Sequence, residues 1–403
     1  MRQKTLMEFR PLPAALLALG LCGAWLPGQA ADADTAGGYR PAEIAGEPAP
    51  SASPASAEKP GGPAIADKSA SGEVPAGPAI AESGQDDATA ASPLRQATLP
   101  LASERYIRSE HTGQRYRIQT TTTGRRPAGG YPVLYVLDGD AQFPMVATAA
   151  HGMVLNGREH GVVPMLIVGV GYGEHAMLHR KARTLDYTPP AADLSDTGDR
   201  GGRPQGGADR FLRFLTEELR PAIARQFPVD AGQQSLYGHS YGGLFVLHAL
   251  FRQPDAFRNY LASSPSIWWN KGYIRGAAER FVQTHGKPGS ALLSGPDAQT
   301  SLPLRLHITV GEHEQNPSPR LDPQSRRAKM QRQRALDYPA SGVFRILESK
   351  VQGLQVGFTE YPAATHATSA MFSALDAPAF ASGSVEMPAR EAGRPRNPGD
   401  QKR

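Results

Sequence analysis

Apolar segments with strand and helix patterns alternate along the chain from residue 131 onward. Two continuous apolar runs, YPVLYVLDGD (131–140) and VPMLIVGVGY (163–172), predict buried strands, the first followed by a turn at its Asp-Gly. The segment ADRFLRFLTEELRPAIARQF (208–227) repeats apolar residues at helical spacing and predicts an amphipathic helix. The same criteria predict strands at 234–239, 257–265, 302–312 and 354–362, and helices at 241–254 and 365–378.

This alternation predicts an α/β fold, in which a mostly parallel sheet is covered by helices on both faces. The patterned part of the chain runs from about residue 99 to residue 380, a normal size for one α/β enzyme domain. We therefore expect a single catalytic domain at 99–380.

The two ends of the chain differ from this domain in composition. Residues 1–30 combine basic residues, a short apolar run and small residues, which indicates a signal peptide cleaved after Ala30. The run is too short and too proline-flanked for a membrane span, so we expect no transmembrane segment after cleavage. Residues 31–98 are rich in Ala, Pro, Gly and Ser and predict a disordered linker, and 381–403 predict a flexible tail.

Charge and cysteine content exclude several classes of function. The net charge of +5 is spread along the chain without a basic stripe of interleaved aromatics, so we expect no nucleic-acid partner. The single cysteine, Cys22, lies in the predicted signal peptide. Leu21 before it argues against a lipoprotein signal, which needs a small residue there. The mature chain therefore has no thiolate nucleophile, disulfide or thiolate metal site.

The motif Gly238-x-Ser240-x-Gly242 matches the nucleophile elbow of serine hydrolases. In a chain with 43 glycines this match alone has little specificity. Its context strengthens it, because a strand is predicted directly before Ser240 and a helix directly after it. The sharp turn requires small residues around the serine, and we expect Gly238, Gly242 and Gly243 to fill that need.

A serine hydroxyl needs a base and an orienting acid, which in this type of hydrolase follow in the order serine, acid, histidine. Glu314 lies just beyond the strand predicted at 302–312, with Glu312 as the alternative acid. His366 follows the last predicted strand. A lone loop histidine is usually only a solvated side chain, but the order Ser240, Glu314, His366 favours catalysis.

Backbone N–H groups must stabilise the oxyanion of the tetrahedral intermediate. We expect one from Tyr241, which follows the nucleophile, and the other from Gly139 or Asp140 after the first predicted strand. A metal site at Asp138 and Asp140 is the competing interpretation, but two carboxylates in a tight turn are a weak ligand set. We expect neither a metal nor another cofactor.

Six segments in order resemble the putative-esterase family of enterochelin-type siderophore esterases, in particular its secreted, periplasmic branch that hydrolyses trilactones. They are YPVLYVLDGDAQF, ARTLDYTPP, LYGHSYGGLF, SSPSIWW, VGEHEQ and THATSAMF. The resemblance covers about 99–375 and implies an α/β-hydrolase fold, a periplasmic location and hydrolysis of the ester bonds of catecholate siderophores such as enterobactin. It also implies that Ser240 is the nucleophile and His366 the base.

A ferric catecholate is an anion, so its site should offer arginines and aromatic faces. Arg180 and Arg183 lie on a predicted loop and are candidates for binding this anion. The sequence is equally consistent with ordinary solvent-exposed charges. Trp268 and Trp269 follow the strand predicted at 257–265 and are both candidates for substrate binding, although we expect one to pack in the core and one to line the cleft.

The predicted partner is thus a small-molecule ester, a ferric or iron-free catecholate siderophore. Two alternatives stay open: an esterase for other acyl or carbohydrate esters, and a secreted binding protein without catalysis. The ordered serine, acid and histidine argue against the second, since binding alone requires none of them.

Overall fold

The computed structural model of the protein describes residues 99–156, 161–173, 177–199, 201–287, 290, 292 and 303–383. The predicted signal peptide (1–30), the linker (31–98) and the predicted tail beyond residue 383 lie outside the described residues. Within the described residues, no helix is both long enough and apolar enough to cross a membrane.

One eight-stranded sheet forms the centre of the fold, in the order β1-β2-β4-β3-β5-β6-β7-β8. β2 runs antiparallel to both of its neighbours, and the strands from β4 to β8 are parallel. This is the topology of the α/β-hydrolase fold. The strands are β1 (Ser103–Arg108), β2 (Arg115–Thr122), β3 (Tyr131–Leu137), β4 (Leu166–Gly171), β5 (Val229–His239), β6 (Asn259–Ser263), β7 (Leu304–Gly311) and β8 (Leu354–Tyr361).

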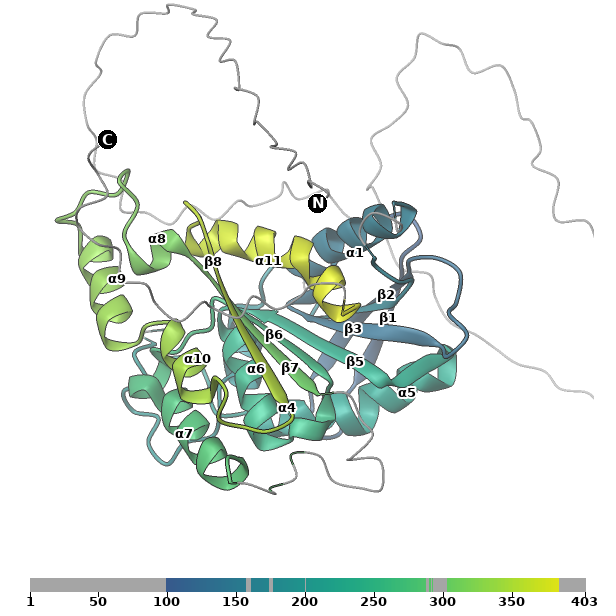
Figure 1. Ribbon diagram of the computed structural model, residues 1–403, viewed down its shortest axis with the longest axis horizontal. Coiled ribbons are helices and arrows are strands. Elements are labelled where there is room, and N and C mark those ends of the chain that lie inside the picture. The colour runs from purple at the N-terminus through teal and green to yellow at the C-terminus, as the bar shows by residue number, and fades with distance from the viewer. Residues whose placement is uncertain are drawn as a thin grey trace, which may run out of the picture. The chain divides into compact units, whose positions relative to one another are not determined.

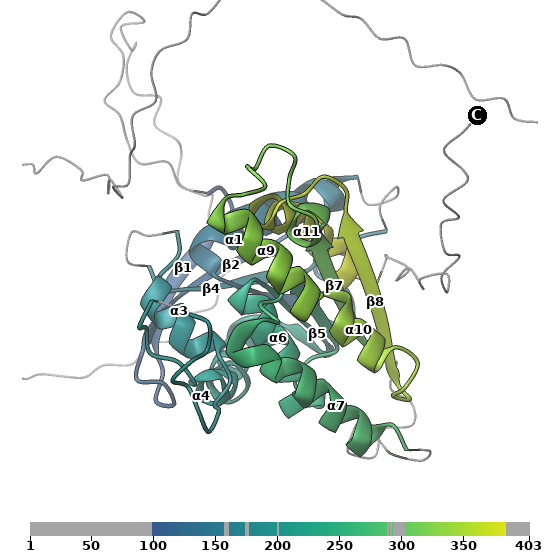
Figure 2. The ribbon, with the colours of Figure 1, turned by 90° about the vertical axis from the view of Figure 1, so that its left-hand side faces the viewer.

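Helices cover both faces of the sheet, as predicted (Figures 1 and 2). α1 and α11 pack together on one face, and α6 packs on the other with α3, α4 and α7 beside it. The α-helices are α1 (Gly139–Leu155), α3 (Arg180–Tyr187), α4 (Ala208–Arg213), α5 (Arg220–Gln226), α6 (Tyr241–Arg252), α7 (Tyr273–His285), α8 (Glu312–Gln315), α9 (Arg326–Asp337), α10 (Ser341–Leu347) and α11 (His366–Ala381). A π-helical segment, η1 (Phe214–Leu219), joins α4 to α5, and two 3-10 turns are η2 (Pro254–Ala256) and η3 (Trp269–Gly272).

β7 shows why a central strand carries both apolar and polar residues. All eight of its residues are buried, because helices cover both faces of the sheet. Its leucines, Ile308 and Val310 enter the larger core on the α6 side. On the α11 side, the Arg305 guanidinium lies 4.6 Å from the centre of the Phe380 ring, and His307 also packs on that ring. The alternation seen in the sequence therefore separates two buried faces.

The sequence prediction was wrong at two loops. The turn expected after β3 is the first turn of α1, which begins at Gly139. The loop expected at Arg180 and Arg183 is helix α3, whose N-cap is His179, with its ring Nδ1 accepting from Ala182 N at 3.1 Å. The sequence RKARTLDY has only eight residues, few of them apolar, and its buried face includes Arg183 and Asp186, so a search for apolar residues at helical spacing did not find this helix.

Candidate active site

Ser240 lies in a sharp turn between β5 and α6, in the left-handed half of backbone space at φ 61° and ψ −116°. Two glycines make this turn feasible. A Cβ on Gly238 would lie 2.5 Å from the Gly242 backbone, and one on Gly243 would lie 2.6 Å from Ser263 O. The prediction was wrong for Gly242, because a Cβ there would have its nearest contact at 3.6 Å, an ordinary van der Waals distance. The close packing that requires glycine is at 238 and 243.

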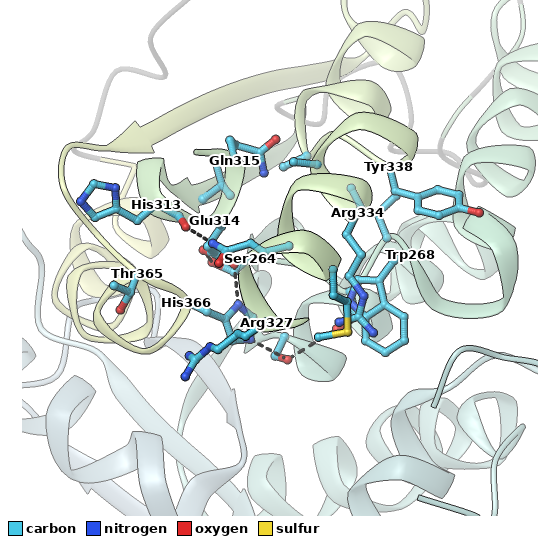
Figure 3. Close-up of a pocket in the computed structure, with 18 of the residues that line it drawn as sticks. Ser264, Trp268, His313, Glu314, Gln315, Arg327, Arg334, Tyr338, Thr365 and His366 are labelled. Atoms are coloured by element: carbon cyan, nitrogen blue, oxygen red, sulfur yellow. Dashed lines mark hydrogen bonds and ion pairs between the residues drawn. The ribbon is translucent and has the colours of Figure 1, made fainter. Parts of the chain in front are cut away.

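The three residues expected to form a catalytic triad lie in one chain of hydrogen bonds, of which Figure 3 labels Glu314 and His366. His366 Nε2 is 3.0 Å from Ser240 Oγ, and His366 Nδ1 is 2.5 Å from Glu314 Oε2. Ser240 follows β5, Glu314 follows β7 and His366 follows β8. The carboxyl ends of these parallel strands meet at one edge of the sheet. In this arrangement the imidazole can accept the serine proton while the carboxylate fixes its tautomer.

Glu314, and not Glu312, is the acid in contact with His366. Glu312 Oε2 instead accepts from Ala363 N at 2.8 Å and holds the loop before α11. Burial disfavours the ionised form of Glu314, but hydrogen bonds from His366, Ser264 and Gly311 N outweigh it and lower its pKa to about 2. Glu314 is therefore a carboxylate at neutral pH.

His239, the residue before the nucleophile, packs against the ring of His366 and contacts its backbone carbonyl. Its ring centre lies 4.5 Å from that of His366, and its Nε2 is 2.9 Å from His366 O. Burial, and then the neighbouring His366, lower the pKa of His239 to about 3. His239 is therefore neutral at neutral pH and donates its Nε2–H to the His366 carbonyl.

The N-termini of α6 and α1 supply the backbone groups expected to form the oxyanion hole. Tyr241 is the first residue of α6, and Gly139 and Asp140 are the first two of α1. The first N–H groups of a helix have no acceptor within it and can bind an anion. The Asp140 carboxylate faces away, because it accepts from Tyr172 N at 2.6 Å and from Arg117 at 3.0 Å.

Arg183 is engaged by Asp138, directly before α1. Its guanidinium donates to both carboxylate oxygens at 2.8 Å, and both side chains are buried. Burial alone would lower the pKa of Arg183, but Asp138 outweighs it and raises the pKa above its ordinary value. The pair fixes Asp138 in a left-handed conformation at φ 51°. Because protein donors already hold the carboxylates of Asp138 and Asp140, the two do not form a joint ligand set.

Two cavities adjoin Ser240. The first, of about 550 Å³, extends from the catalytic residues toward α9 and α10 and is lined both by apolar groups such as Ile267 and Leu321 and by Arg320, Arg327 and Arg334. The second, of about 640 Å³, we call the arginine cavity. Among the described residues that line it, Asp199 is the one acidic residue, and six are arginines: Arg180, Arg183, Arg203, Arg326, Arg327 and Arg334.

The arginines of the second cavity differ in what they can offer a ligand. Arg183 and Arg203 are paired with Asp138 and Asp199. The Arg334 guanidinium lies 3.6 Å above the Trp268 ring, where the two cavities meet, as Figure 3 shows. The positive charge facing the cavity therefore comes chiefly from Arg180, which was predicted, and from the α9 residues, which were not.

The two tryptophans separate as expected, one into the core and one into the cleft. Trp268 lines both cavities. Trp269 is fully buried, and its Nε1 donates to Gln205 at 2.6 Å. Assigning Trp269 to substrate binding was therefore wrong, because no ligand in the cleft can reach a ring with no exposed surface.

Helix α9 supplies the binding-site residues that the sequence analysis missed. Arg326, Arg327, Met330 and Arg334 all reach the arginine cavity from this one helix. Their signal is the strongly basic sequence RRAKMQRQRALD, which lacks a continuous apolar stripe and was not recognised as an element.

Comparison with known proteins finds a matching family and several siderophore esterases among the similar proteins. The model of the family described as putative esterase matches residues 109–343. The ferri-bacillibactin esterase of Bacillus subtilis is 34% identical over 244 residues, which is 60% of this chain and 80% of that protein. The siderophore enterobactin esterase of Emericella nidulans is 38% identical over 192 residues, 46% of this chain and 58% of that protein. The solved siderophore hydrolase EstA of Aspergillus nidulans superposes with a TM-score of 0.61 at 28% identity, covering 73% of this chain and 99% of that one.

Proposed function

The chain belongs to the putative esterase family and is a carboxylic ester hydrolase, and from that premise we propose that it hydrolyses the trilactone ester bonds of catecholate siderophores such as enterobactin. The relatives named above support a siderophore ester as the substrate. The observation that carries the catecholate assignment is the arginine cavity beside Ser240.

The reaction follows from the hydrogen-bond chain. Ser240 Oγ attacks the ester carbonyl carbon while His366 Nε2 takes its proton, and Glu314 stabilises the resulting imidazolium. The oxyanion lies between the N–H groups of Tyr241 and of Gly139 or Asp140. Collapse of the intermediate releases the alcohol, which receives the proton from His366. Water then attacks the acyl-enzyme by the same steps and restores Ser240.

Charge favours an anionic ligand over a neutral one. Catecholate oxygens are negative when they bind ferric iron, and guanidinium groups match such oxygens by charge and geometry. Trp268 adds an aromatic face where the two cavities meet. The first cavity combines apolar groups such as Ile267 and Leu321 with Arg327 and Arg334, so it can hold an aromatic ring together with a negative charge.

We also propose that the protein is exported to the periplasm after cleavage following Ala30. Support comes from the basic, apolar and small-residue pattern of residues 1–30. Mass spectrometry of the protein from the periplasmic fraction should give an N-terminus at Ala31, and a full-length chain confined to the cytoplasm would contradict export.

Competition kinetics test the siderophore assignment. Ferric enterobactin should raise the apparent KM of wild type for a neutral aryl ester without changing kcat, since both compete for the cleft beside Ser240. A Ser240→Ala variant should retain binding, seen as quenching of Trp268 fluorescence, while losing aryl-ester hydrolysis. Unchanged aryl-ester kinetics at millimolar siderophore would contradict the assignment but leave the esterase activity in place.

A further inference from the structure

The carboxylate of Glu314 uses its two oxygens for different purposes. Oε2 contacts His366, whereas Oε1 accepts from Gly311 N at 2.8 Å, Ser264 Oγ at 2.6 Å and Ser369 Oγ at 3.1 Å. One oxygen thus holds the carboxylate in place, and the other remains aimed at the imidazole.

The donors to Oε1 come from separate parts of the fold. Gly311 ends β7, Ser264 follows β6, and Ser369 lies in the first turn of α11, three residues after His366. Both serines are buried, at 3% and 0% exposure. Figure 3 shows Ser264 beside Glu314.

The two hydroxyls are also linked to each other and to the base. Their oxygens are 2.6 Å apart, and Ser369 Oγ is 3.1 Å from His366 O. Each hydroxyl has one proton, so Ser264 donates to Glu314 while Ser369 donates to Ser264, to Glu314 or to the carbonyl. When Ser369 donates to Glu314 or to Ser264, the network connects the acid to the helix turn that carries His366.

Ser264 is held in this position at an energetic cost. It has φ 41°, a left-handed conformation that a serine rarely adopts. Its N–H donates to Thr309 O at 2.7 Å, which fixes the turn between β6 and the cleft. Strain that persists next to reacting groups is characteristic of pre-organised sites.

A glutamate needs such anchoring more than a shorter aspartate does, because it has one more rotatable bond. Glu314 lies on α8, a helix of only four residues, and the His366 side chain is 49% exposed. Without fixed donors to Oε1, the carboxylate could rotate away and leave an exposed imidazole without its orienting partner.

We propose that Ser264 and Ser369 are positioning residues, which hold Glu314 and thereby His366 in the geometry that catalysis requires. This rests on the proposed catalytic roles of Ser240, Glu314 and His366. Ser369 lies outside both cavities, and Ser264 lines the first cavity but directs its hydroxyl to Glu314 Oε1, so both serines act through the acid rather than on the reacting atoms.

A double-mutant cycle with a neutral aryl ester tests this. Ser264→Ala and Ser369→Ala should each lower kcat about 3- to 10-fold, the effect of losing one hydrogen bond to a charged group, with KM changed less than about twofold. In a Glu314→Gln background, adding either serine substitution should lower kcat no further, because the carboxylate they position is absent.

The matched control is Ser373→Ala, a fully buried serine on the same helix whose Oγ contacts Tyr237 and Ala370 and not Glu314. It should retain wild-type kcat. Serine effects that persist undiminished in the Glu314→Gln background, or a normal kcat in both serine variants, would overturn the proposal. Because the aryl ester is not a siderophore, failure of the siderophore assignment does not affect this test, and an active Ser240→Ala variant would identify a failure of the proposed nucleophile instead.

Discussion

Ser240 shows how a single residue is prepared for chemistry before any ligand arrives. Its backbone at φ 61° is a conformation that costs about 1–3 kcal/mol for a residue with a side chain. Packing of β5 against α6 maintains it, and the hydroxyl is left beside the His366 imidazole at 3.0 Å. The strain thus positions the nucleophile at the junction of the two cavities.

At the residue scale, the first prediction concerns the acid. Glu314→Gln should lower kcat by about 100-fold or more, since an amide neither stabilises the imidazolium nor enforces the required tautomer. Glu312→Gln should lower kcat less than about threefold, because that side chain only accepts from Ala363 N. Steady-state kinetics on an aryl ester measure both, and equal losses would contradict the assignment of the acid.

A second residue-scale prediction concerns acid stability. His239 has a pKa of about 3 in the folded protein and its ordinary 6.5 in the unfolded chain. The unfolded state therefore binds an extra proton between these values, and the free energy of unfolding should fall as pH decreases from about 6.5 toward 3. In His239→Gln, which keeps a donor for His366 O, this decrease should be smaller.

Urea unfolding of both proteins between pH 7 and pH 5 measures this difference. This pH range excludes the effect of Glu314 on the free energy of unfolding. Because its pKa is lowered from 4.5 to about 2, protonation of Glu314 destabilises the folded protein only below about pH 4.5. Parallel pH dependences for wild type and His239→Gln would show that His239 is not held neutral.

Sequence patterns led to the proposed reacting residues but not to the two serines that we propose to position them. Ser240, Glu314 and His366 follow strand ends in a fixed order, so pattern and order identify them. Ser264 and Ser369 are 105 residues apart, and nothing in either local sequence indicates that their hydroxyls meet at 2.6 Å. Such contacts arise only when β6 and α11 pack.

At the element scale, the turn from β5 to α6 depends on close packing that only glycine permits. Gly243→Ala should destabilise the protein by more than about 2 kcal/mol, because its Cβ would lie 2.6 Å from Ser263 O. Gly152→Ala, in the exposed part of α1 with no atom within 4 Å of the new Cβ, should stabilise it by about 0.5–1 kcal/mol. Thermal unfolding compares the two, and equal effects would contradict the packing argument.

Helix α9 gives a second element-scale prediction. Arg326→Glu and Arg327→Glu should each raise KM for ferric enterobactin at least about 10-fold at low salt, and much less for a neutral aryl ester, because they reverse charge in the arginine cavity. Lys329→Glu makes the same charge change on the same helix outside both cavities and should have little effect. Equal effects of all three variants would indicate only long-range electrostatics.

The elements predicted from the sequence have a clear hydrophobic period, but such a period was not always recognised: α7, with buried Ile274, Ala278 and Phe281 at helical spacing, was not predicted. β3 to β8 and α6 carry continuous or alternating apolar residues because they form the core. β1 is an edge strand with mostly exposed side chains, and α3 and α9 are short charged helices. Tertiary packing rather than local pattern determines these last three.

At the scale of the whole molecule, the parallel sheet brings distant residues together. Groups following β3, β5, β6, β7 and β8 converge at its carboxyl edge, where open α/β sheets bind ligands. The order of strands in the sequence was sufficient to predict this convergence. Much of the positive charge in the arginine cavity was not predicted, because it comes from arginines of α9, a helix that the sequence analysis did not identify.

The central claim is tested most directly by chromatography of enterobactin, with and without iron, after incubation with the mature protein and with a Ser240→Ala variant. We predict linear trimer and shorter products from wild type alone, because the trilactone bonds are cut through Ser240. Intact enterobactin in both samples, while the wild type still hydrolyses an aryl ester, would contradict the siderophore assignment.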